Sequence, residues 1–286
     1  MKKTSTVILT ALLTIGLLTV AGAEEYAISW HCINSGGGDS SGGDYKLSAS
    51  VGQSVAGFAN SADFLHWTGF WSGDVPNPQA VTSIGVAKAL PEGMFISISG
   101  NIATSAEGDF ADYFYIENAK KTSGIRIAAP PGAIADLVRG SVVNVFGVLG
   151  ATSDGERQLT GPIVIVVATD QPLNPVAMPN RSVGGGDFGL PPSGQFGVTD
   201  ALGNPSNGLN TIGMLIKTWG RVIGSGEGYV LIDDGSDSPV RVDTSTLSSI
   251  PVESQYITVI GISSLQKSGS VRFREVMPRR QSDVDW

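Results

Sequence analysis

Four short blocks occur twice, in the same order, in this 286-residue sequence. Three of them are rich in the β-branched and aromatic residues typical of strands, and corresponding blocks lie 114 to 120 residues apart. The blocks, first copy over second, are 99–102 over 219–222, 113–118 over 229–234, 124–127 over 239–242 and 142–148 over 256–262. A repeat this long indicates a duplicated domain rather than a solenoid unit.

Each copy is expected to contain five short strands, with a weakly patterned link between the third and the fourth. In the first copy this link covers 130–140, where 133–138 is predicted to form one helical turn, and in the second it covers 244–254. Five strands with a helix between the third and fourth outline an OB-fold barrel.

Particular residues carry the same likeness. The start of an OB domain is similar to three successive pieces of the second copy: Trp219-Gly220-Arg221-Val222, then 229–232 followed by Asp233-Asp234-Gly235-Ser236, then 240–242. Residues 259–262 are similar to the fourth strand of such a domain. Over about 175 residues, the chain resembles tandem OB-like domains of secreted bacterial proteins of unassigned role. The resemblance implies a fold and no catalytic residue.

The sequence ahead of the repeat predicts a small β module. Strands are expected at 26–33, 45–51 and 64–71, with glycine turns at 36–38 and 42–43. The closing Gly-Phe-Trp-Ser-Gly resembles a short module near the N-termini of secreted bacterial proteins. The predicted fold class is therefore all-β, with two tandem OB-like five-stranded barrels preceded by this module. The predicted segments are a signal peptide 1–23, the β module 24–78, OB-like domains 82–178 and 213–286, and a Gly/Pro-rich connector 179–212.

The first residues have the pattern of an export signal. Lys2 and Lys3 precede an apolar run at 7–20, and Ala21-Gly22-Ala23 is a small-x-small cleavage site. A run of 14 residues is too short to span a bilayer. We therefore expect cleavage near Ala23 and a secreted, periplasmic or cell-surface protein with no transmembrane segment in the mature chain.

Composition narrows the classes of function. With one Cys and two His, the chain cannot form a disulfide scaffold or a Cys-based zinc site. Cys32 is expected to be either buried and inert or paired with another chain. Loss of Lys2 and Lys3 leaves 16 basic and 26 acidic residues, a net charge of −10, which disfavours general binding to polyanions.

Catalytic and metal patterns are weak. Residues 38–42 fit G-x-S-x-G but lack the strand-to-helix context of a nucleophile elbow. His31 and His66 each neighbour a Trp, and we interpret them as histidines of the β module. The acidic run 233–237 suits either calcium or a hairpin turn, and the turn is favoured. We predict no catalytic residue, no metal ligand and no cofactor.

Strand alternation places candidate ligand-binding residues on the outer barrel faces. Phe114, Ile116, Val230 and Ile232 would face the cores, so that their neighbours point outward. OB folds bind ligands on the face of strands 2 and 3, and outward Tyr beside Arg could stack on bases or sugars. The candidates are Tyr113, Tyr115, Arg126, Trp219, Arg221, Tyr229, Arg241, Arg272 and Arg274.

The leading hypothesis is a non-catalytic exported protein that binds an envelope or matrix partner, protein or glycan, through its barrel surfaces. One alternative is an exported OB protein that binds single-stranded nucleic acid. Charge disfavours it, because residues 82–178 carry a net −3 and residues 213–286 a net −1. A third interpretation is an accessory module of an enzyme whose catalysis resides in another chain.

Overall fold

A computed structural model describes residues 36–42, 45–51, 57–60, 65–68, 78–130, 132, 134 and 136–286. Ahead of residue 78 it describes two strand pairs. Strand β1 (Gly36–Gly42) pairs with β2 (Tyr45–Val51) in antiparallel fashion, and β3 (Gly57–Asn60) pairs with β4 (Leu65–Thr68). The predicted glycine turn at 36–38 is wrong, because these glycines begin β1 and pair with residues 49–51. The predicted strand 26–33 lies outside the described residues.

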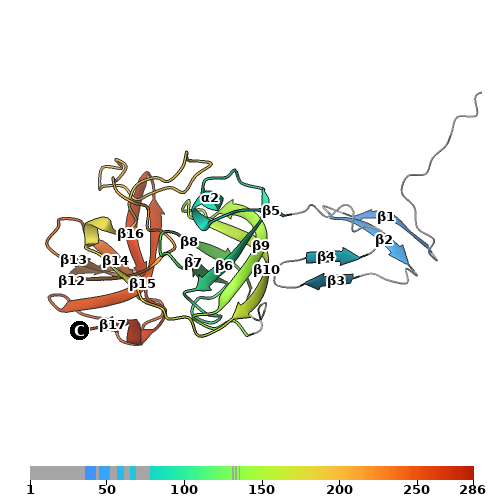
Figure 1. The fold of residues 1–286 in the computed structure, drawn as a ribbon. Coiled ribbons are helices and arrows are strands. Elements are labelled where there is room, and N and C mark those ends of the chain that lie inside the picture. Colours follow the sequence, from blue (N-terminus) through green and yellow to red (C-terminus); the bar gives the residue numbers. More distant parts are fainter. Residues whose placement is uncertain are drawn as a thin grey trace, which may run out of the picture. The chain divides into compact units, whose positions relative to one another are not determined.

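The first barrel is built from five strands (Figure 1). They are β6 (Phe95–Ala103), β7 (Tyr113–Glu117), β8 (Gly124–Ala128), β9 (Val142–Ala151) and β10 (Arg157–Ala168). The order is β6-β7-β8-β10-β9, and pairing of β9 with β6 closes the ring. Only β8 and β10 pair in parallel within this ring. Strand β5 (Gln79–Ala80) adds to β6, and helix α2 (Ile84–Lys88) begins at Ser83, whose hydroxyl accepts from the Val86 N–H.

The second barrel repeats this order with β12 (Leu215–Gly226), β13 (Tyr229–Asp233), β14 (Val240–Asp243), β15 (Tyr256–Ser268) and β16 (Val271–Met277). Strand β12 pairs with β15 to close the ring, and β14 pairs with β16 in parallel. The short elements β11 (Val176–Ala177), η2 (Asn180–Ser182), η3 (Gln281–Asp283) and β17 (Val284–Asp285) lie at its margins.

These topologies confirm the predicted fold class. The four repeated sequence blocks fall on strands with equivalent places in the two rings, namely β6 and β12, β7 and β13, β8 and β14, and β9 and β15. The helical turn predicted at 133–138 is not found at the described positions of that link, which form turns and bends. The described residues contain no helix long and apolar enough to cross a membrane.

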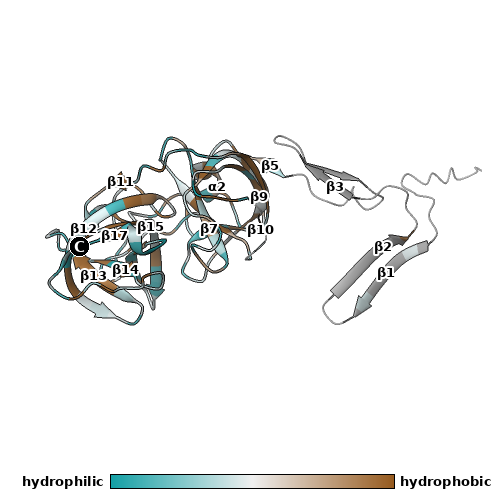
Figure 2. Cartoon of the chain, turned by 90° about the horizontal axis from the view of Figure 1, so that it is seen from below, coloured by the Kyte–Doolittle hydropathy of each residue, from teal (hydrophilic) through white to brown (hydrophobic). Residues whose placement is uncertain are grey.

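Each barrel has its own apolar core. Phe114 and Ile116 are buried in the first, and Val230 and Ile232 in the second, as alternation predicts. In Figure 2 hydrophobic residues (brown) recur along the barrel strands, while many connecting loops are teal or white. Burial of these alternating positions is the main force that closes each sheet into a ring.

The connector 179–212 is ordered and packed. Bridges join Phe188 to Gln195 and Thr199 to Pro205. Val198 is fully buried against Ile212 and Leu265. The connector therefore adds its own small core, although its apolar side chains Leu190 and Leu209 are exposed.

The two barrels approach at backbone distance where Gly124 meets Gly213. A Cβ atom on Gly124 would lie 2.0 Å from the Gly213 carbonyl oxygen. Gly213 itself has a φ of +85°, which favours glycine. No larger residue fits at 124 unless the barrels separate.

We predict that Gly124→Ala lowers the free energy of unfolding by about 3 kcal/mol or more, because the clash is with backbone that cannot rotate away. Denaturant unfolding followed by tryptophan fluorescence measures it. The matched control is Gly224→Ala in β12, where an added Cβ meets nothing within 4 Å, and a change within about 0.5 kcal/mol is expected. Equal losses in both variants would contradict the close contact.

Candidate functional site

The outer face of β7, the predicted binding face of the first barrel, is covered by the second barrel. Tyr115 is fully buried and packs in one cluster with Leu215, Ile262 and Met277. Tyr113 lies beside it, with its hydroxyl 3.9 Å from the Met277 sulfur. Both tyrosines point out of their own barrel, as alternation predicts, but Tyr115 has no accessible surface. Its assignment as a ligand-stacking residue is therefore wrong.

The Glu156 carboxylate lies at the centre of this interface. Its Oε2 accepts hydrogen bonds from the Tyr115 hydroxyl at 2.9 Å and from the Ser264 hydroxyl of β15 at 3.0 Å. Burial raises the pKa of Glu156, and nearby Arg126 opposes that shift. Burial, followed by the charge of Glu156, raises the pKa of Tyr115 well above its ordinary value. Oε2 of Glu156 thus joins one donor from each barrel in a buried site.

Lys88 completes this buried polar group from α2. Its Nζ donates to the Ile212 carbonyl oxygen at 2.8 Å and to Asn210 Oδ1 at 3.4 Å, so it also holds the connector. Burial lowers its pKa to about 7, while Glu156 opposes the shift. This role could not be predicted from the sequence, because a lone Lys in a short helix is normally exposed.

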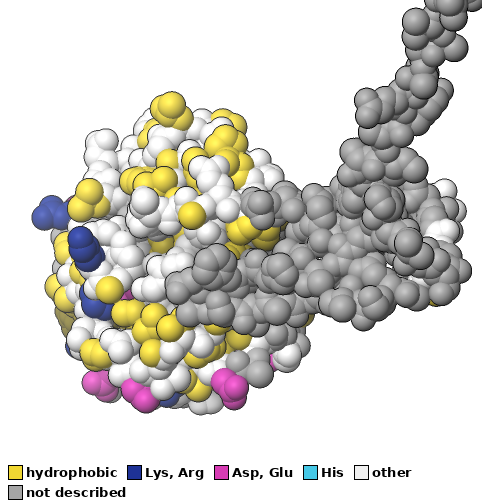
Figure 3. Space-filling model, turned by 45° about the vertical axis from the view of Figure 1, so that its right-hand side comes forward, with side chains coloured by type: hydrophobic (Ala, Val, Ile, Leu, Met, Phe, Trp, Pro, Cys, Tyr) yellow, Lys and Arg dark blue, Asp and Glu magenta, His cyan; other side chains and the backbone are white. Residues whose placement is uncertain are grey.

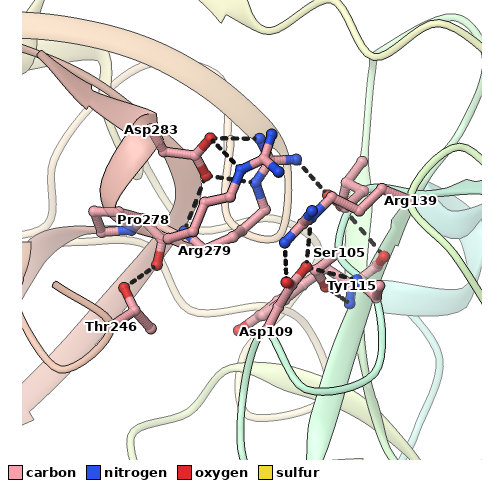
Figure 4. Close-up of polar contacts among 11 residues, drawn as sticks. Ser105, Asp109, Tyr115, Arg139, Thr246, Pro278, Arg279 and Asp283 are labelled. Atoms are coloured by element: carbon pink, nitrogen blue, oxygen red, sulfur yellow. Dashed lines mark hydrogen bonds and ion pairs between the residues drawn. The ribbon is translucent and has the colours of Figure 1, made fainter. Parts of the chain in front are cut away.

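A second polar contact joins the barrels near the end of the chain (Figure 4). Arg279, which follows β16, donates from Nη1 to the Thr104 carbonyl oxygen at 2.7 Å. Asp283 pairs with the same guanidinium at 2.8 Å. Nearby, Arg139 pairs with Asp109 within the first barrel. Arg279 is only 8% exposed, so its role here is structural.

Four predicted arginines are engaged by neighbouring side chains or backbone. Arg126 stacks on Tyr113 at 3.5 Å, and Arg241 stacks on Phe273 at 3.7 Å, as guanidinium carbon to ring centroid. Arg272 and Arg274 share a face of β16 that the connector overlies, with hydrogen bonds to Gly197 O at 2.8 Å and Ser206 Oγ at 3.0 Å. Tyr229 is half-buried beneath Arg241, 4.4 Å from its guanidinium carbon. These contacts leave the strand 2 and 3 faces with little free aromatic surface.

An exposed aromatic group lies instead on β12, on β15 and directly after β17. Trp219 is 45% exposed, Tyr256 75% and Trp286 45%. They surround Thr258, which lies opposite Trp219 on one side and Asp285 on the other. The five residues line a shallow pocket of about 370 Å³. We call them the aromatic platform.

Of the sequence candidates, only Trp219 belongs to this platform. Arg221 is its neighbour on the same face of β12, and its guanidinium donates to Ser254 Oγ at 3.0 Å. Tyr256 and Trp286 were missed. The signal for Tyr256 was available, because it begins the fourth strand at an outward position, but its proximity to Trp219 depends on ring closure.

Charged side chains are sparse on the face of the barrels that Figure 3 shows. In the view of Figure 3, Lys and Arg side chains lie mostly toward one side and acidic side chains mostly along the lower edge, with apolar and uncharged surface between them. This separation leaves broad neutral areas, as the low charged fraction of 15% implies.

The acidic run 233–237 forms a turn. Asp233 Oδ1 accepts from the Gly235 N–H, and Asp234 Oδ1 accepts from the Ser236 N–H. No group of three or more His, Cys, Asp or Glu residues suited to a metal is found among the described residues. Residues 38–42 lie within β1 and are not followed by a helix. His31 and Cys32 lie outside the described residues, and only the backbone of His66 is described.

Comparisons with known proteins give little guidance. No family model and no curated protein matches the sequence. Among solved structures, the chain is similar to a murine DNA-binding protein bound to double-stranded DNA, with 13% identity over 64% of this chain and 90% of that one, at a TM-score of 0.30. It is likewise similar to the Ifi202 HINa domain in complex with 20-bp double-stranded DNA, with 12% identity over 64% and 92%, at 0.30. A TM-score of 0.30 supports no conclusion about this chain.

Glu275 on β16 generates a pH prediction. Burial raises its pKa to about 7, and the charges of Asp243 and Glu156 add to the shift while Arg241 opposes it. Between pH 4.5 and 7 the folded state therefore holds a proton that the unfolded chain has released. The free energy of unfolding should fall as pH rises through this window, by up to about 3 kcal/mol at about 1.4 kcal/mol per pKa unit.

Glu275→Gln keeps a neutral side chain, so it should flatten this dependence and be more stable than the parent at pH 8. Urea unfolding at pH 4.5, 6 and 8 measures it. The control is Glu253→Gln at an exposed position, which should leave the slope unchanged. The assignment would be contradicted if the stability of the parent rises between pH 5 and 7 and the stability of the Glu275→Gln variant does not rise more steeply over the same range.

Proposed function

We propose that this is an exported, non-catalytic protein that binds a glycan of a cell envelope or matrix through the aromatic platform. The observation that carries the proposal is the grouping of Trp219, Tyr256 and Trp286 around a hydroxyl and a carboxylate. Three large rings on one sheet face are costly to leave in water unless a ligand covers them. The N-terminal export pattern supports a location where such polymers occur.

The chemistry of the platform matches that of a sugar. A pyranose ring has an apolar C–H face, which packs on an aromatic ring, and a rim of hydroxyl groups. The Asp285 carboxylate accepts hydrogen bonds from hydroxyls, and such charge-assisted bonds are the stronger ones. Thr258 adds a hydroxyl that donates and accepts. The pocket is shallow, which suits internal units of a chain rather than a fully enclosed monosaccharide.

Single-stranded nucleic acid is the second candidate, because bases also stack on aromatic side chains. Lys217 and Arg221 lie on the same face of β12 and could meet phosphates. Against this, Asp285 lies within the platform, and most of the predicted arginines are engaged within the fold. A polyanion would have to pass that carboxylate without a basic track to follow.

The test is a glycan array with the mature chain 24–286, followed by calorimetric titration of the strongest hit. Trp219→Ala should weaken binding about tenfold or more, because a stacked aromatic contributes on the order of 1–3 kcal/mol and 1.4 kcal/mol is tenfold. Tyr256→Phe should retain more affinity than Tyr256→Ala, since it keeps the ring.

Leu202→Ala removes another exposed apolar side chain, 85% exposed and outside the platform, and should bind like the parent. Array hits that persist unchanged in Trp219→Ala would place the site elsewhere. An oligonucleotide that binds tightly at low salt, and loses affinity steeply as salt rises, would favour the nucleic-acid alternative. The absence of any glycan hit together with that result would overturn the proposal.

A further inference from the structure

A second cavity, separate from the aromatic platform, lies where the first barrel, the connector and the second barrel meet. Its volume is about 790 Å³, within the range of roughly 300–1,000 Å³ that small-molecule sites occupy. Val176, Met178, Met214 and Leu209 supply much of its apolar wall. Met178 and Met214 belong to the second barrel core, so this wall is fixed by packing rather than by a loose loop.

The charged groups of the lining are all basic. They are Lys121 from the β7–β8 loop, Arg181 from η2 and Arg274 from β16, and no Asp or Glu lines the cavity. This is unexpected in a chain with 26 acidic and 18 basic residues. Lys121 is already paired with Glu117 at 2.8 Å, so the uncompensated positive charge comes from the two arginines.

Arg274 is held in place but incompletely bonded. Its Nη2 donates to Ser206 Oγ at 3.0 Å, while its Nε is buried and has no hydrogen-bond partner. Burial lowers the pKa of Arg274, and the carboxylate that opposes this shift, Asp200, is itself fully exposed and screened by water. Because Arg274 lines the cavity, an anion bound there would meet its positive charge.

We propose that this cavity binds a monocarboxylate with a hydrocarbon chain, such as a fatty acid. The carboxylate would receive hydrogen bonds from Arg274 and, at the rim, from Arg181. The chain would lie along Met178, Met214 and Val176, where flexible methionines adapt to an extended ligand. A bare phosphate or sulfate would satisfy the arginines but leave the apolar wall uncovered, and a neutral lipid would do the reverse. This inference is independent of the glycan site.

Calorimetric titration of the mature chain with dodecanoate, below its micelle concentration at pH 7.5, tests the proposal. One saturable site is expected, with dodecanol at least about tenfold weaker because it lacks the charge-assisted bonds. Octanoate should bind more weakly than dodecanoate, because each buried methylene adds affinity. Inorganic phosphate alone should bind far more weakly than dodecanoate.

Arg274→Gln and Arg181→Gln should each weaken dodecanoate about tenfold or more and leave dodecanol unchanged. Arg181 is exposed, so its variant keeps the test valid if the Arg274 variant fails to fold. Arg280→Gln removes a 55% exposed arginine outside the cavity and is the matched control.

The proposal is overturned by equal affinity for acid and alcohol, by affinity that does not depend on chain length, or by arginine variants that bind like the parent. Binding to anionic phospholipid vesicles without binding to monomeric dodecanoate would also overturn it, since that result assigns the charge to a membrane surface.

Discussion

The hydrogen bonds of Glu156 tie the two barrels into one body. A buried carboxyl group is costly unless its oxygens find donors. Here Oε2 alone accepts from both barrels, from the Tyr115 hydroxyl of the first and the Ser264 hydroxyl of the second, while Oε1 is buried without a hydrogen-bond partner. Removal of either partner leaves a buried acceptor less satisfied in a low-dielectric site. Apolar contacts such as Tyr115 with Leu215 would tolerate some sliding. The carboxylate geometry does not, so it fixes the orientation of one barrel on the other.

That orientation decides which surfaces remain for ligands. An isolated OB barrel presents strands 2 and 3 to its ligand, but here β7 faces the second barrel and Arg126 is stacked on Tyr113. The connector then covers the face of β16 that carries Arg272 and Arg274. Among the described residues, the β12–β15–β17 face, with its exposed rings, and the cavity at the junction stay open. The same association that hides the usual face therefore creates the second site.

The fold was predictable because it depends on local alternation and on a repeat. Phe114 and Val230 mark core positions by their spacing alone, and glycines mark the hairpin at Gly228. The site was much less predictable. Alternation shows that Tyr115 points out of its strand, but not whether solvent or another barrel lies there. Nor does it show that Tyr256 lies near Trp219, since this proximity requires β15 to close the ring against β12.

The local distribution of charge was even harder to predict from the sequence. Counting residues gives each barrel a small negative charge and argues against general binding to polyanions. The average hides a local inversion, because folding gathers Arg181 and Arg274 at one wall and keeps carboxylates out of the lining. A ligand responds to the groups within a few ångströms, where screening is weak, rather than to the net charge of the chain. An acidic protein can thus hold a small anion while it repels an anionic polymer, because only the small anion fits inside the positively charged region around Arg181 and Arg274.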